Sequence, residues 1–193
     1  MTNIYAQEEE IINIENIDGI ILGGSSSSVY ENAQWISKLR DQIKVIYTHN
    51  IPLLGCCFGS HIIADTLGGM IGKGKTSELG IQTVSLTRNG EKDPLFYNLP
   101  NEIDVITSHE DDIFSIGNMG TRLAYNQVSS YQSFSFGALT KGVQFHPEYT
   151  IDTLNKMEEI YGIEKTSKNV SYVGKQIIDN FFQHIVYENK YGK

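Results

Sequence analysis

Residues 51–69 of this chain have the sequence IPLLGCCFGSHIIADTLGG. The first apolar residues predict a short buried strand, and the apolar residues of the second half follow a helical period that ends at Gly68-Gly69. Between them stands Gly55-x-Cys57-x-Gly59, with a thiol where the G-x-S-x-G nucleophile elbow has serine. The stretch therefore predicts a strand, a sharp turn and a helix, with the Cys57 side chain raised above the sheet.

Cys57 is the candidate nucleophile, and Cys56 is its buried neighbour. The N-terminus of a helix that begins just after Cys57 favours a thiolate over a thiol. Taken alone, the turn is equally compatible with an inert core thiol, as free cysteines often are. A second motif is needed to decide between the two.

That motif lies at residues 143–148, which read VQFHPE. An alternating apolar strand leads to His146, and Pro147 interrupts the strand so that the chain turns there. Glu148 can then fold back on the imidazole, fixing its tautomer and stabilising the imidazolium. A cysteine nucleophile needs a base and an orienting acceptor, so Cys57, His146 and Glu148 form a candidate catalytic triad.

The combination of the two motifs resembles the class I (triad) glutamine amidotransferases, most closely their GMP-synthase-like branch. The resemblance runs from about Asp18 almost to the C-terminus. Other stretches that are similar, in the order of the family, are 18–25, 28–31, 78–80, 108–111, 131–134 and 174–182.

The resemblance implies an α/β fold of three layers, flavodoxin-like, with a mainly parallel central sheet, helices on both faces and a small antiparallel annex. It also implies that Cys57 attacks the side-chain amide of glutamine and that a γ-glutamyl thioester is then hydrolysed. The loop after the strand at 19–22 has free backbone N–H groups, so Gly24 and Phe58 are the expected oxyanion-hole donors.

The expected substrate contacts are Gly23, Ser25, His61, His109, Glu110 and Asp111. His61 departs from the family, which usually has glutamine four residues after the nucleophile. Position 61 lies one helical turn beyond Cys57 and should face the substrate pocket. A γ-glutamyl peptide or another γ-glutamyl compound is therefore an alternative substrate.

Three functions remain open on the sequence. A glutaminase would supply ammonia to a synthetase on another chain, because no second domain or nucleotide-binding motif is recognisable. The sequence Gly72-Lys73-Gly74-Lys75 lacks the spacing of a phosphate-binding loop. A γ-glutamyl hydrolase could act alone, and a non-catalytic interaction subunit would keep the fold without the reaction.

Composition narrows the class of protein. A chain of 193 residues with 40% hydrophobic residues suffices for one domain, which we expect to cover 1–193. A net charge of −8 argues against nucleic acid or an anionic membrane as a partner. We expect a cytoplasmic protein without cofactor or metal, since no signal peptide or membrane span is recognisable and the five histidines lack metal-ligand spacing.

The expected strands are 19–22, 51–54, 81–87, 103–107, 121–126, 132–136 and 141–145, and the expected helices include 33–39, 153–161 and 175–186. Residues 43–47 fit either the end of the first helix or a short link. Residues 108–112 are expected in a loop beside the substrate. Before residue 18 stands a short acidic lead, and we expect the family's first strand to be missing there.

Overall fold

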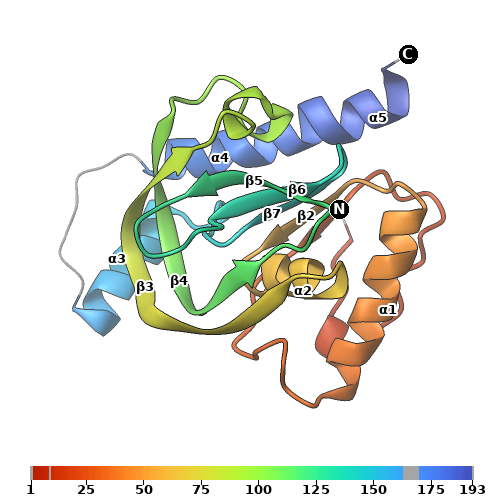
Figure 1. Cartoon of the computed structure of the whole chain (residues 1–193), viewed down its shortest axis with the longest axis horizontal. Helices are drawn as coiled ribbons and strands as arrows, with labels where there is room; N and C mark the ends of the chain where they lie inside the picture. Colours follow the sequence, from red (N-terminus) through yellow and green to blue (C-terminus); the bar gives the residue numbers. More distant parts are fainter. Residues whose placement is uncertain (1, 9, 163–169, 193) are drawn as a thin grey trace.

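The structure, a computed structural model, describes residues 2–8, 10–162 and 170–192. Seven strands of this part form one sheet in the order β1-β2-β7-β6-β5-β3-β4. They are β1 (Ile20–Leu22), β2 (Leu53–Cys56), β3 (Met70–Leu86), β4 (Glu102–Ser115), β5 (Gly120–Tyr125), β6 (Ser133–Phe136) and β7 (Thr140–Val143). Figure 1 shows this sheet curling between two layers of helix.

Parallel pairing is confined to β1, β2 and β7, and the remaining neighbours pair antiparallel. The α/β class with helices on both faces is confirmed, but the antiparallel part is larger than the expected annex. The reason lies in the connections. A helix joins β1 to β2, whereas β6 and β7 are joined by a short turn, which reverses the strand direction.

One helical layer consists of α1 (Gln34–Thr48) and α2 (Phe58–Thr66), and the other of α4 (Val170–Asn180) with a π-helical segment η4 (Phe181–Tyr187) and α5 (Glu188–Tyr191). Residues 43–47 thus belong to α1. Strand β2 alternates between the two layers: Leu53 packs into the cluster under α1 and α2, and Leu54 into the cluster under α4 and η4. In this second layer Ile177, Phe181 and Ile185 are buried, whereas Phe182 is exposed.

The remaining helices are short or peripheral. Helix α3 (Ile151–Tyr161) lies beside β3 and β4 (Figure 1). Leu154 and Met157 of this helix pack against apolar residues of the two strands. Three 3-10 turns, η1 (Ala6–Glu8), η2 (Gly90–Lys92) and η3 (Pro94–Phe96), complete the described part. Asp93 is the N-cap of η3, and its carboxylate accepts a hydrogen bond from the Leu95 N–H at 3.0 Å.

The largest difference from expectation is the length of the β3–β4 hairpin. The expected loop at 108–112 is strand, because β4 continues to Ser115 and pairs with a β3 that already begins at Met70. The charged residues of both strands tolerate this pairing since they face each other with opposite sign. Glu78 lies opposite His109, and Lys73 is 3.7 Å from Glu110.

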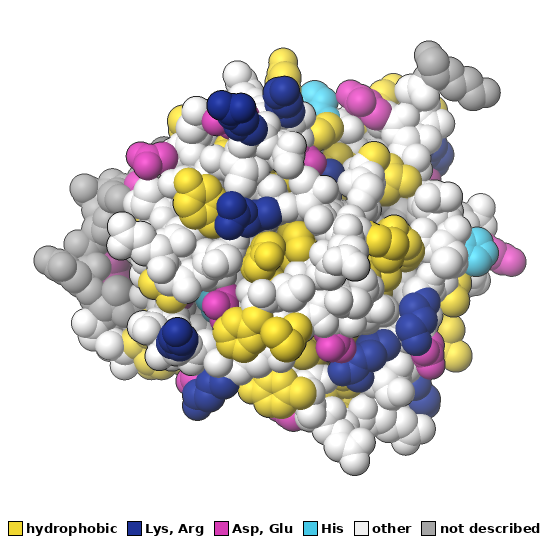
Figure 2. All heavy atoms as spheres, in the orientation of Figure 1, with side chains coloured by type: hydrophobic (Ala, Val, Ile, Leu, Met, Phe, Trp, Pro, Cys, Tyr) yellow, Lys and Arg dark blue, Asp and Glu magenta, His cyan; other side chains and the backbone are white. Residues whose placement is uncertain are grey.

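At the other edge of the sheet, β1 is the first strand of the described residues, and η1 precedes it. The missing family strand stays a prediction, as does a single domain over 1–193, which includes residues outside the described ranges. Among the described residues, no helix is long and apolar enough to cross a membrane. On the face shown in Figure 2, basic, acidic and hydrophobic side chains are interspersed.

Candidate active site

Cys57 occupies the bend between β2 and α2. Its backbone has φ 51° and ψ −115°, a conformation that residues other than glycine rarely adopt. Helix α2 begins at the next residue, so its N-terminus is directed at Cys57. The thiol has a weak contact of 3.8 Å from Sγ to the carbonyl oxygen of Ser108.

The two glycines of the motif make the bend possible. A Cβ at Gly55 would lie 2.5 Å from the Gly59 backbone, and a Cβ at Gly59 would lie 2.2 Å from the Leu22 carbonyl oxygen. The Gly59 N–H donates to the carbonyl of Gly23 at 3.1 Å. The elbow is therefore held against the end of β1 by backbone contact, which only residues without a side chain permit.

His146 and Glu148 form the second part of the site. The Nδ1 atom of His146 lies 2.7 Å from a carboxylate oxygen of Glu148, so Nδ1 carries a proton. Burial lowers the pKa of His146, but the neighbouring Cys57 and Glu148 outweigh that effect and raise it to about 9. The imidazole is thus protonated at neutral pH, and its buried Nε2 has no hydrogen-bond partner among the described residues.

Two contacts position the residue His146. Its backbone N–H donates to the carbonyl of Ile106 on β4 at 2.8 Å. The ring of Tyr149 stacks on it, with 4.0 Å between centroids and 13° between planes. The ring itself is thus held by the stacking with Tyr149 and by the hydrogen bond to Glu148.

The expected oxyanion donors lie beside these residues. A Cβ at Gly24 would be 3.2 Å from Cε1 of His146 and 4.0 Å from the Cys57 sulfur, so the loop backbone passes directly over the thiol. Phe58 is the first residue of α2, where N–H groups lack intrahelical partners. Gly23 accepts the hydrogen bond from Gly59 and does not line the cavity next to Cys57.

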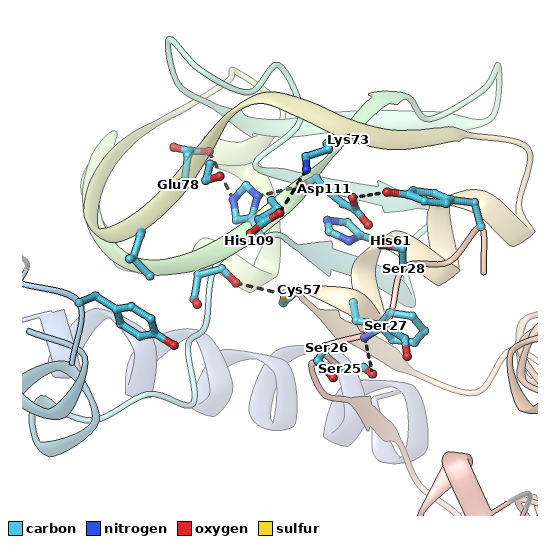
Figure 3. A pocket seen from close by; sticks show the side chains of 17 residues that line it. Ser25, Ser26, Ser27, Ser28, Cys57, His61, Lys73, Glu78, His109 and Asp111 are labelled. Atoms are coloured by element: carbon cyan, nitrogen blue, oxygen red, sulfur yellow. Dashed lines mark hydrogen bonds and ion pairs between the residues drawn. The ribbon is translucent and has the colours of Figure 1, made fainter. Parts of the chain in front are cut away.

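That cavity has a volume of about 760 Å³ and extends from Cys57 between the loop at 25–30 and the β3–β4 hairpin (Figure 3). It brings together five predicted contacts, Ser25, His61, His109, Glu110 and Asp111. The Tyr30 hydroxyl donates to Asp111 at 2.8 Å, which joins the serine loop to β4.

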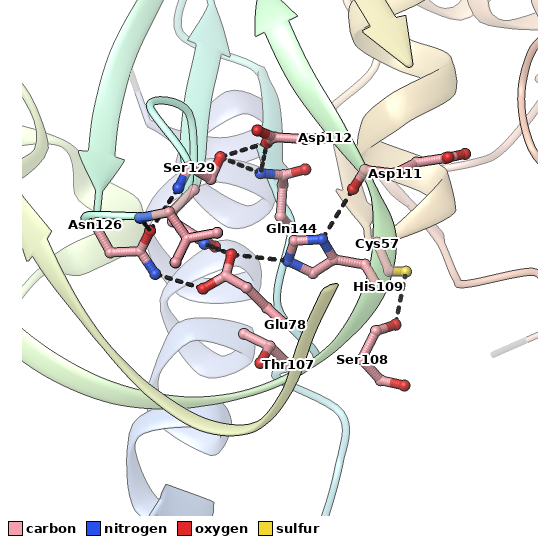
Figure 4. Close-up of polar contacts among 12 residues, drawn as sticks. Cys57, Glu78, Thr107, Ser108, His109, Asp111, Asp112, Asn126, Ser129 and Gln144 are labelled. Atoms are coloured by element: carbon pink, nitrogen blue, oxygen red, sulfur yellow. Dashed lines mark hydrogen bonds and ion pairs between the residues drawn. The ribbon is translucent and has the colours of Figure 1, made fainter. Parts of the chain in front are cut away.

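The wall of the cavity is backed by a buried polar network, drawn in Figure 4. Glu78 accepts hydrogen bonds from Asn126 at 2.6 Å and from Gln132 at 2.5 Å, and it lies 3.3 Å from Nε2 of His109. Burial raises the pKa of Glu78, but His109 and the amide donors outweigh this and lower it below its ordinary value. On its other side, His109 donates through Nδ1 to the Asp111 carbonyl at 2.9 Å.

The residues predicted from the sequence include Cys57, Phe58 and five others that line the cavity, but the network behind the cavity was not predicted. Glu78 was noticed only as part of a family-like stretch, since the polar residues before it hide the strand to which it belongs. Gln144 was quoted only as part of the 143–148 motif, and Tyr149, which follows this motif, was given no role. The cavity further includes Tyr30 and Tyr161, for which no local pattern in the sequence is a signal.

Comparison with known proteins identifies the family. The family model described as "Glutamine amidotransferase class-I" matches residues 1–159. The chain is 36% identical over 136 residues to a subunit of the glutamine-hydrolysing GMP synthase from Picrophilus torridus, covering 70% of this chain and 69% of the relative. It is 28% identical over 146 residues to γ-glutamyl peptidase 3 from Arabidopsis thaliana, covering 74% and 59%.

The chain thus spans about three fifths of the γ-glutamyl peptidase. Among solved structures, a glutamine amidotransferase from Thermotoga maritima superimposes with a TM-score of 0.80 at 24% identity, covering 93% of this chain and 84% of that one. This similarity supports the fold. The family model and the GMP synthase relative support the resemblance inferred from the two motifs, and the chain belongs to the class-I glutamine amidotransferase family.

Proposed function

We propose that the chain hydrolyses the side-chain amide of glutamine through Cys57, His146 and Glu148, and that it supplies ammonia to a synthetase on another chain. The observation that carries this proposal is the His146–Glu148 pair, which keeps an imidazolium beside a cysteine at a nucleophile elbow. The relationship to a separate subunit of GMP synthase supports a synthetase on another chain.

In the proposed reaction the Cys57 thiolate attacks the amide carbon, and a carbon–sulfur bond forms while the carbonyl oxygen becomes an oxyanion. The N–H groups of Gly24 and Phe58 stabilise this oxyanion. His146 gives the Nε2 proton to the leaving nitrogen, the carbon–nitrogen bond breaks, and ammonia departs. His146 then takes a proton from water, which attacks the thioester and releases glutamate and the thiolate.

A γ-glutamyl hydrolase is the second candidate. The cavity volume of about 760 Å³ lies within the range for ligands of drug size and leaves space beyond a single glutamine. The relationship to γ-glutamyl peptidase 3 and the histidine at position 61 also favour it. Both candidates share the same nucleophile, thioester and second half-reaction, and they differ in the leaving group.

The test is covalent labelling by a glutamine-analogue chloroketone, read by intact mass, with glutamine or γ-glutamyl dipeptides as competitors. Labelling that is lost in Cys57→Ala and blocked by glutamine supports the glutaminase. Blocking by γ-glutamyl dipeptides alone supports the hydrolase. A folded protein that is not labelled and releases no glutamate contradicts both and leaves the interaction subunit.

A further inference from the structure

The β3–β4 hairpin runs past Cys57, and one end of the cavity along it is polar. The Cys57 sulfur lies 3.8 Å from the carbonyl oxygen of Ser108, which marks the place of the thiol along β4. Lys73, Glu110 and Asp111 line the cavity further along the hairpin, where Lys73 lies opposite Asp111. Since a strand rises about 3.3 Å per residue, Asp111 is about 10 Å along β4 from Ser108. Figure 3 shows Lys73 and Asp111 together, on the same side of Cys57.

The other end of the cavity, toward α3, is apolar. Leu79 lies opposite Ser108 in the hairpin, lines the cavity and packs against the apolar cluster that α3 forms with β4. Tyr149 packs against the same cluster, and Tyr161, the last residue of α3, lines the cavity. Burial raises the pKa of Tyr149, and Tyr161 is among the nearby groups that raise it further, so the two tyrosines are within electrostatic reach of each other. Leu79, Tyr149 and Tyr161 together form this apolar end.

His146 stands on the same side of the thiol as the apolar end. Its backbone N–H donates to the carbonyl of Ile106, which precedes Ser108 on β4 and so lies away from the polar end. Its ring stacks on that of Tyr149. In the proposed reaction His146 gives its Nε2 proton to the leaving nitrogen, so this nitrogen must face His146. Any group that the nitrogen carries is then directed toward the apolar end.

We propose that Leu79, Tyr149 and Tyr161 form a leaving-group subsite, which selects γ-glutamyl amides of amines that carry an apolar or aromatic group. The inference rests on the proposed function, because it takes the γ-carbonyl to be bound at Cys57 and His146 to be the proton donor. The polar end of the cavity offers charges of both signs to the ammonium and carboxylate groups of the γ-glutamyl part, which all these substrates share. The substrates differ only in what enters the subsite.

The chemistry of the reaction is unchanged in such a substrate. The amide nitrogen takes the Nε2 proton of His146, the carbon–nitrogen bond breaks, and a free amine departs in place of ammonia. Water then hydrolyses the thioester to glutamate and the thiolate. Ammonia would leave the subsite empty, so glutamine gains no affinity from it. Of the two candidate functions, the subsite therefore favours the γ-glutamyl hydrolase.

The test compares γ-glutamylphenylalanine with γ-glutamylglycine, which differ only in the side chain of the leaving amino acid. The subsite is open on one side, since Tyr161 is 62% exposed. Burial of part of a phenyl ring there should make kcat/KM for γ-glutamylphenylalanine roughly ten times higher. Tyr161→Ala should remove most of this preference, and Tyr161→Phe, which keeps the ring, should retain it. The matched control is Ile160→Ala, because Ile160 is exposed on the same helix and does not line the cavity.

Equal kcat/KM for the two dipeptides in the native protein overturns the inference and leaves the proposed triad reaction standing. Hydrolysis of glutamine alone does the same, as does a preference that survives both Tyr161→Ala and Leu79→Ala. The preference is a ratio measured on one sample, so it does not depend on how much of a variant is folded.

If no substrate is hydrolysed, the proposed function fails, and calorimetry with the two dipeptides tests the subsite by itself. Tighter binding of γ-glutamylphenylalanine that is lost in Tyr161→Ala supports the inference. Equal binding of the two dipeptides, or no binding of either, contradicts it.

Discussion

The two halves of the sheet hold their parts of the site by different means. On the side of β1, β2 and β7, the elbow is positioned by backbone contact, with Gly59 against Leu22 and the loop at Gly24 against Cys57. On the side of β3 and β4, the cavity wall is positioned by buried side chains, above all Glu78 and its three polar neighbours.

This difference indicates on which side of the sheet amino-acid substitutions are tolerated. Backbone contact leaves no room for a side chain, so the reacting groups stay in place whatever the substrate. A wall of hydrogen-bonded side chains can be altered one residue at a time, provided that every buried polar group keeps a partner. We therefore expect substitutions on the first side to abolish catalysis or folding, and those on the second side to change affinity.

Cys57→Ala should have the largest effect on activity. Removal of the nucleophile should lower glutamine hydrolysis on the order of 10⁴-fold or more, with little change in stability. The matched control is Cys56→Ala, since burial raises the pKa of the Cys56 thiol and keeps it inert in the core. Glutamate release would be measured for both, and comparable activity of the Cys57 variant would contradict the assignment.

Gly59→Ala tests the backbone contact itself. The added methyl would lie 2.2 Å from the Leu22 carbonyl oxygen, so the elbow must move or the protein unfolds. We expect the free energy of unfolding to fall by about 3 kcal/mol or more. Gly23→Ala, where nothing lies within 4 Å of the new methyl, should change it by about 0.5 kcal/mol at most. Urea denaturation that gives the two variants equal stability would remove the basis of the comparison.

Glu148→Gln should change how the rate of glutamine hydrolysis depends on pH. Glu148 helps to raise the pKa of His146 to about 9, and the leaving nitrogen takes its proton from His146, so the rate of glutamine hydrolysis should decline near that pH in the native protein and at lower pH in the variant. The raised pKa also stabilises the fold. This contribution is complete below pH 6.5 and is lost as the pH rises through 9.

The variant should therefore lose less stability over this alkaline range. Denaturation at several pH values measures this loss of stability, and glutamate release at the same pH values gives the activity profile. An alkaline limb that does not move in Glu148→Gln would show that Glu148 does not tune His146.

Glu78→Gln should have the smallest of these effects. Glu78 lies on the side of β3 and β4, where buried side chains position the cavity wall. One amide donor would then face the new amide nitrogen, so the network loses a hydrogen bond, and we expect a cost of about 1 to 3 kcal/mol in stability. KM should rise more than kcat falls. Glu110→Gln, an exposed partner of Lys73, is the control and should cost no more than about 1 kcal/mol. If Glu78→Gln lowers kcat more than affinity, Glu78 acts on the reaction step and not mainly on substrate binding.

The elbow and the His146–Glu148 pair could be recognised in the sequence because their signals are local. Gly55, Cys57 and Gly59 specify a bend within five residues, and His146 with Glu148 within three, so each motif is complete without knowledge of the fold. The β3–β4 hairpin was predicted poorly. Its residues 70–80 are rich in glycine and 108–112 are polar or charged, and both form strands because each pairs with the other across a large sequence separation.

By itself, then, the sequence determined the elbow at Cys57, the glycines that shape it and the nearness of Glu148 to His146, since local sterics and short spacing decide them. The tertiary structure alone decided that Glu78, His109, Gln144 and Asp112 lie in one buried network. It also placed the amide of Gln144 between the His61 ring, at 2.9 Å, and the Asp112 carboxylate, at 3.0 Å, because these three residues come from distant parts of the chain.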